Sequence, residues 1–159
     1  MIETIASLIE RLNAERDKTM AFFSTLTVEQ WRQPVYTGDP SWTPRNILAH
    51  TVSAEGEFLR LFRDVQTGGS GAPLGFFADE FNAAEQEALG DLTQQELLSE
   101  FLRLRAEMTA WVRTLSNTDL EKTGRHPVLG DIPLWEMIKA LTLHAHLHAR
   151  DIRRFFGVA

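Results

Sequence analysis

Three of the five histidines lie in one short segment near the end of the chain, at His144, His146 and His148. On a helix, residues four apart share a face, whereas a residue two along points away. His144 and His148 can therefore address one point in space, and His146 is expected to face the solvent. Two imidazoles at this spacing are half of a metal site. Ala145 stands where the H-E-x-x-H motif of metalloproteases carries glutamate, so that motif is excluded.

A third histidine, His50, falls on the apolar stripe of an earlier predicted helix, close in angle to Ala54 and Leu61. An imidazole on an apolar face needs a partner there. We therefore predict a divalent metal held by His50, His144 and His148. Three neutral imidazoles suit zinc, nickel, iron or copper and leave a position open for water or substrate. The structural alternative is a set of core histidines satisfied by hydrogen bonds, and the spacing alone does not exclude it.

Three further titratable residues stand near the predicted site. Glu57 follows His50 by about two helical turns at a similar angle, and is a candidate general base or a partner of a metal ligand. Asp151 lies three residues past His148, and the same two roles are open to it. For both, the alternative is an ordinary carboxylate at the solvent edge of a helix. His126 lies in the loop before the last helix. We expect a surface histidine there, and the alternative is a residue that reaches the mouth of the bundle.

The composition is that of an ordinary globular protein, with 43% apolar and 24% charged residues, and we expect one domain over residues 1–159. The net charge of −6 argues against a nucleic-acid partner, which needs clustered Lys and Arg. The chain has no cysteine, so disulfides and thiolate ligands are excluded. Neither a signal peptide nor an apolar run of roughly 18 residues is present, so we expect a cytoplasmic protein without a membrane partner.

Apolar residues recur at helical spacing in four long segments, 2–26, 44–65, 93–115 and 133–156. The buried stripe of the last segment is predicted to reach Phe155. Helix starts are marked by Thr43-Pro44 and by capping-box patterns at Thr27, Thr93 and Thr118. The connection from 64 to 91 is long enough to cross a bundle from end to end, with a short helix at 76–88, and no strand is expected. These features predict an all-α four-helix bundle with a long connection between helices 2 and 3.

Two of these segments resemble a known family. The run W-T-P-R-N-I-L-A-H, from Trp42 to His50, resembles the segment that opens the second helix of the DinB/YfiT-like superfamily. The run H-A-H-L-H-A-R-D-I, which starts at His144, resembles the closing H-x-x-x-H segment of that family. The resemblance implies an up-down-down-up bundle, a divalent metal at His50, His144 and His148, and a homodimer. The family often carries Gln where this chain has Asp151.

The resemblance also implies an activity, because members of the superfamily include metal-dependent transferases and isomerases that use low-molecular-weight thiols. We therefore expect a thiol-dependent S-transferase acting on a small-molecule substrate, in which the metal favours the thiolate. The basic cluster of Arg150, Arg153 and Arg154 would bind carboxylates of the thiol, or would simply complement the helix dipole.

Three other functions compete with this prediction. The first is a hydrolase that uses metal-bound hydroxide, with Glu57 as its base. The second is a non-enzymatic role, as a metal-binding or dimerising stress protein whose histidines are structural. The third is DNA binding, which the name of the family suggests and the net charge of −6 disfavours.

Overall fold

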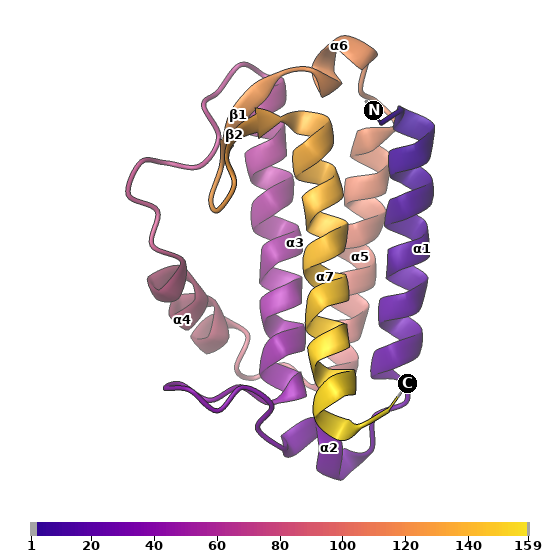
Figure 1. Cartoon of the computed structure of the whole chain (residues 1–159), viewed down its shortest axis with the longest axis vertical. Coiled ribbons are helices and arrows are strands. Elements are labelled where there is room, and N and C mark those ends of the chain that lie inside the picture. Colours follow the sequence, from indigo (N-terminus) through magenta and orange to yellow (C-terminus); the bar gives the residue numbers. More distant parts are fainter. Residues whose placement is uncertain (1–2, 159) are drawn as a thin grey trace.

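Four long helices form the body of the protein (Figure 1). The structure is a computed structural model that describes residues 3–158. The long helices are α1 (Ile5–Phe23), α3 (Pro44–Gln66), α5 (Gln94–Val112) and α7 (Leu134–Phe156). The shorter elements are α2 (Val28–Arg32), α4 (Ala78–Ala88), α6 (Asn117–Leu120) and the strands β1 (Thr123–His126) and β2 (Gly130–Pro133). The prediction of a helical bundle is confirmed, whereas the prediction that no strand forms was wrong.

The order of the helices gives the bundle its up-down-down-up topology, as expected. In Figure 1, α1 runs down, α3 and α5 both run up, and α7 runs down. The parallel pair α3 and α5 pack together, as do α1 and α7, and α3 also packs against α7. Two consecutive helices can be parallel because the connection between α3 and α5, which carries α4, returns along the outside of the bundle.

Reciprocal capping boxes start most of these helices. They lie at Thr4 for α1, Thr27 for α2, Thr43 for α3 and Thr93 for α5, so three of the predicted helix starts are confirmed. The predicted cap at Thr118 was wrong. Ser116 is the N-cap of α6 instead, because its side chain accepts from the backbone N–H of Asp119, whose carboxylate accepts from the N–H of Ser116. The start predicted for the first helix, at residue 2, lies outside the described residues.

Buried apolar residues form two clusters along the bundle axis. One gathers at the end that carries the strands, around Leu12, Phe62 and Met137, and the other lies near α2, around Phe101 and Ile152. Phe155 was predicted to belong to the buried stripe but is 43% exposed. Phe156, four residues after Ile152, packs against the second cluster in its place.

An ion pair is buried in the bundle between α3 and α5. Both side chains, Glu55 and Arg105, are fully inaccessible to solvent, and they are joined by two hydrogen bonds. A third nitrogen of Arg105 donates to the backbone oxygen of Leu12 on α1 at 3.0 Å. The pair therefore links three of the four long helices through polar contacts in the core.

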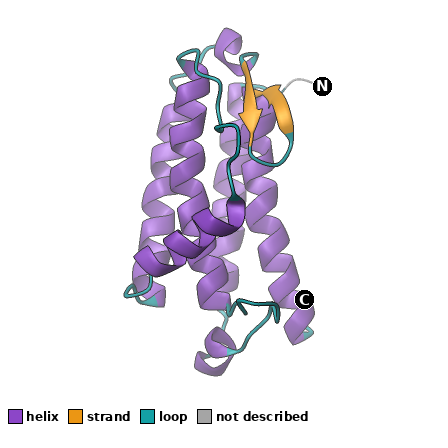
Figure 2. Ribbon diagram, turned by 90° about the vertical axis from the view of Figure 1, so that its left-hand side faces the viewer, coloured by secondary structure: helices purple, strands orange, loops and turns teal. Residues whose placement is uncertain are grey.

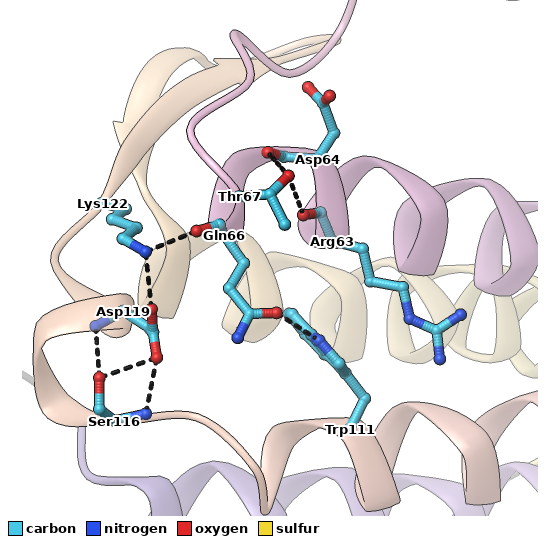
Figure 3. A network of polar contacts seen from close by, with 8 residues as sticks. All are labelled: Arg63, Asp64, Gln66, Thr67, Trp111, Ser116, Asp119 and Lys122. Atoms are coloured by element: carbon cyan, nitrogen blue, oxygen red, sulfur yellow. Dashed lines mark hydrogen bonds and ion pairs between the residues drawn. The ribbon is translucent and has the colours of Figure 1, made fainter.

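A polar network attaches the end of α3 to the segment that leads into β1 (Figure 3). The ammonium group of Lys122 donates to the backbone oxygen of Gln66 and to the carboxylate of Asp119. Trp111 on α5 donates through Nε1 to the side-chain oxygen of Gln66 at 2.8 Å. These contacts hold the start of β1 in place, and with it His126 at the end of that strand.

The connection that leaves α3 runs beside β1 before it enters α4 (Figure 2). The backbone N–H of Arg125 donates to Ser70 and the carbonyl of Arg125 accepts from Ala72, both at 2.8 Å. Gly71 lies between them with a φ of +84°, and a Cβ there would meet the carbonyl oxygen of Arg125 at 2.6 Å. Only glycine fits this position. The two backbone hydrogen bonds join the connection to the hairpin, and together these segments cover one side of α3.

Candidate metal centre

His50 on α3 meets His144 and His148 on α7, where these two helices pack together. Nε2 of His144 lies 2.9 Å from Nε2 of His50 and 3.1 Å from Nε2 of His148. One ligand atom from each of the three lies within 4.8 Å of the others. His146 is exposed on the far side of α7, as predicted. We call the three inward residues the histidine triad.

Burial keeps the histidine triad in its neutral form. Burial, together with the smaller effect of the charge that His148 would carry, lowers the pKa of His50 to about 4 and that of His144 to about 3. Burial also lowers the pKa of His148, with Asp151 opposing the shift. At neutral pH each ring therefore has one nitrogen with a lone pair, which is the form that binds a metal.

Tyr36 connects His148 to a carboxylate. Its hydroxyl lies 2.9 Å from Oδ2 of Asp151 and 2.9 Å from Nδ1 of His148. Burial and the contact with Asp151 raise the pKa of Tyr36, so the hydroxyl keeps its single proton and donates it to the carboxylate. The tyrosine oxygen then accepts from Nδ1–H of His148. We assign this tautomer from the hydrogen bonds, and it leaves the lone pair of Nε2 directed at the triad.

A short backbone ladder holds Tyr36 over His148. Trp42 donates its N–H to the carbonyl of Tyr36 at 2.8 Å and accepts from the N–H of Tyr36 at 3.1 Å. The indole of Trp42 also packs beside His50, with the ring centres 5.1 Å apart. Sequence reasoning missed Tyr36, and the signal available was small: it is the only tyrosine in the chain and lies in a predicted loop.

The donor set of the triad fits a divalent metal. Hydrogen bonds cannot satisfy all three rings, because His144 has one proton or one lone pair at Nε2 and two close neighbours there. Nδ1 of His50 and Nδ1 of His144 are buried without a partner among the described residues. The spacings of 2.9 and 3.1 Å are slightly shorter than the separation of about 3.4 Å between nitrogens on a tetrahedral zinc. A small outward movement of the rings would therefore admit such an ion.

A cavity of about 310 Å³ adjoins two members of the triad. Its walls come from α3, α4, α7, the connection before α4 and the hairpin turn, and they are mainly apolar. His50 and His144 line it, together with the polar residues Glu57, Asn82 and His126. Glu57 is 24% exposed and accepts two hydrogen bonds from Arg60, which is directed to the solvent.

His126 was expected at the surface, and this expectation was wrong. The side chain is 7% exposed because the hairpin turn folds over it. Its Nδ1 accepts from the backbone N–H groups of Val128 and Leu129, at 3.1 and 3.2 Å. The ring stacks on Phe58 with 5.1 Å between ring centres. His126 is therefore a buried, oriented residue of the cavity wall.

The basic cluster lies apart from the cavity, on the last turns of α7. Arg150 donates to Asp151 at 3.1 Å, and the guanidinium of Arg153 lies over the ring of Phe22. Arg154 is exposed. The three arginines are not among the residues that line the cavity. Their role in binding a cofactor stays a prediction.

The fold and the site together define a class, that of four-helix bundles with parallel middle helices and three converging histidines, two of which line a cavity. The family model of the DinB superfamily matches residues 11–152, and the chain belongs to this superfamily. No curated protein sequence matches the chain.

Several solved structures share the fold at low sequence identity. YfiT from Bacillus subtilis, described as a probable metal-dependent hydrolase, is 20% identical with a TM-score of 0.75, over 98% of this chain and 89% of YfiT. The mycothiol-dependent maleylpyruvate isomerase is 14% identical with a TM-score of 0.77, over 94% of this chain and 61% of that protein. The colibactin self-resistance protein ClbS, solved with double-stranded DNA, is 14% identical with a TM-score of 0.71, over 95% of this chain and 94% of ClbS. These likenesses show the fold.

Proposed function

We propose that this protein is a metal-dependent enzyme that holds zinc, nickel or iron on His50, His144 and His148. The observation that carries the proposal is the convergence of three neutral imidazole nitrogens, two of them from residues that line an apolar cavity. A metal held there would supply Lewis acidity and would lower the pKa of a thiol or a water molecule. The cavity would hold a small-molecule substrate next to it.

The reaction that we propose is the transfer of a low-molecular-weight thiol to an electrophilic substrate. The apolar walls would exclude water from the reacting atoms, which favours attack by sulfur over hydrolysis. Arg150, Arg153 and Arg154 would bind carboxylates of the thiol outside the cavity. The shared fold with a mycothiol-dependent isomerase supports a thiol cofactor, at the level of the fold.

A hydrolase is the second candidate, because a carboxylate lies on the cavity wall. Glu57 lines the same cavity as His50 and His144, and Arg60 holds it from the solvent side. It is the group that would accept a proton from an attacking water. The fold shared with YfiT, described as a probable metal-dependent hydrolase, is consistent with this alternative.

Turnover assays on zinc-loaded protein separate the two reactions. We expect conjugates of bacillithiol, mycothiol or glutathione with neutral apolar electrophiles, detected by mass spectrometry, and we expect chelation to abolish them. Turnover without any thiol, lost on chelation, would replace the transferase by the hydrolase. Inactivity under both conditions, with zinc bound, would favour the non-enzymatic role.

The Tyr36→Phe variant tests how the triad is oriented. It removes the acceptor of Nδ1–H of His148 and the donor to Asp151, and we expect about 10- to 100-fold weaker zinc affinity. Competition with a chelating indicator measures it. Thr37→Ala, at an exposed neighbouring position, is the matched control and should keep the affinity of the parent. Equal affinity in the two variants would show that Tyr36 does not orient His148.

The partner predictions have different support. Among the described helices, none combines the length and the apolar character needed to cross a membrane. The net charge of −6 keeps nucleic acid a disfavoured partner, although ClbS shares the fold and was solved with DNA. We propose a homodimer in the cytoplasm on the resemblance to the family alone.

A further inference from the structure

The cavity beside the triad is large enough for more than a single ring. Its volume is about 310 Å³, roughly twice that of an apolar cavity of about 150 Å³ that binds benzene. Apolar side chains from three helices line it: Phe58 and Leu61 from α3, Phe81 from α4, and Leu143 and Leu147 from α7. A ligand that fills this space must itself be largely apolar.

Exposed apolar side chains surround the entrance. Val128, Leu129 and Leu143 line the cavity and are 79%, 53% and 54% exposed. Leu74 and Phe77, 83% and 66% exposed, flank residues of the wall in the connection before α4. Exposed apolar groups gathered at one cavity mark a place where an apolar molecule binds.

Charge in the cavity wall disfavours an anionic ligand. Glu57 is the one acidic residue among the lining residues, and no lysine or arginine lines the cavity within residues 3–158. In the metal-free protein, a carboxylate ligand would therefore be desolvated without a cation to pair with in the wall. The residues of the wall by themselves favour a neutral ligand.

His126 supplies one fixed hydrogen-bond donor. Its Nδ1 accepts from two backbone N–H groups, at 3.1 and 3.2 Å, so the proton of the neutral ring is on Nε2. Nε2 lies on the other side of the ring from the turn and has no hydrogen-bond partner in the described part of the chain. Stacking on Phe58 prevents the ring from turning away. Nε2 is not among the buried atoms that lack a partner, so solvent can reach it in the empty cavity. A ligand that displaces this solvent leaves the donor unsatisfied unless the ligand brings an acceptor.

We propose that the cavity binds a neutral apolar carbonyl compound, such as an aromatic or short-chain ketone or ester, whose carbonyl oxygen accepts from Nε2–H of His126. Because His50 and His144 line the same cavity, a ligand bound there would lie beside the candidate metal centre. The identification of this ligand class as the substrate rests on the proposed function, whereas the binding itself does not require the metal.

Three matched probes test this assignment on the metal-free full chain: acetophenone, ethylbenzene and benzoate, titrated by isothermal calorimetry or ligand-observed NMR. We expect acetophenone to bind best and benzoate worst. The His126→Phe variant keeps an aromatic ring but removes the Nε2–H donor, together with the Nδ1 acceptor of the turn. It should bind acetophenone about three- to tenfold more weakly and ethylbenzene unchanged. Ala78→Trp, at an exposed position of the wall, should weaken all binding by filling the cavity.

A spectroscopic measurement covers the case in which His126→Phe fails to fold. In the unaltered protein, the Nε2–H resonance of His126 should shift with acetophenone and not with ethylbenzene. Equal binding of benzoate, equal losses for both neutral probes in His126→Phe, or an unshifted resonance would overturn the assignment. Probe binding without turnover of any substrate would refute the proposed enzyme and leave the binding site standing. Turnover without probe binding would refute the proposed binding site and leave the proposed enzyme standing.

Discussion

His144→Ala should reduce the bound zinc from about one ion per chain to background. Its Nε2 is the atom within 3.1 Å of both other members of the triad, so its removal leaves two separated ligands. Elemental analysis after desalting measures the loss. In the unaltered protein, zinc at 100 times its dissociation constant should add about 2.7 kcal/mol to the free energy of unfolding, a rise of about 5–10 °C in melting temperature. The variant should show no such rise.

His146→Ala is the matched control for this loss. It removes an exposed imidazole from the same helix, two residues away, and should leave the zinc content unchanged. His50→Ala and His148→Ala should behave like His144→Ala. Unchanged metal content in both would refute the central site and leave the histidines as a hydrogen-bonded core.

Arg105→Met should cost about 3–5 kcal/mol of unfolding free energy. The change leaves the carboxylate of Glu55 fully buried without its cation, and it also removes the donor to the carbonyl of Leu12. Urea denaturation followed by circular dichroism measures the difference. Replacing both partners, with Glu55→Leu added to Arg105→Met, should recover most of the loss because no unpaired charge then remains.

Arg103→Met provides the comparison on the same helix. Arg103 is 58% exposed and pairs with Glu100 and Glu107 in solvent, so its replacement should cost less than about 1 kcal/mol. A double variant as unstable as Arg105→Met alone would show that the loss comes from packing rather than from the unpaired carboxylate.

The buried pair also bears on the candidate site. Glu55 and His50 lie on the same helix, little more than one turn apart, so contacts that hold α3 against α5 also hold His50 in its position facing α7. The sequence around Arg105 on α5 carries no pattern that predicts burial of its side chain. Its burial depends on the partner that α3 brings to it.

Local periodicity in the sequence was sufficient to predict the four long helices and to select the three members of the triad. The four-residue spacing of His144 and His148, and the place of His50 on an apolar stripe, depend on the helical repeat, which neighbouring residues determine. The helix start at Thr43-Pro44 and the capping boxes at Thr27 and Thr93 could be recognised for the same reason. The superfamily resemblance added the helix order, which periodicity does not contain.

Only the tertiary structure decided which residues complete the site. Tyr36 contacts His148 although the two residues are 112 positions apart in the sequence. His126 is buried because a hairpin folds over α3, and no alternation of apolar and polar residues predicted that hairpin. Such contacts depend on the paths of loops, which carry no repeat that a sequence could reveal. The sequence by itself therefore placed three histidines on the inner faces of two helices. The packing of the connecting segments determined the tautomer of His148, the cavity and the position of His126 in its wall.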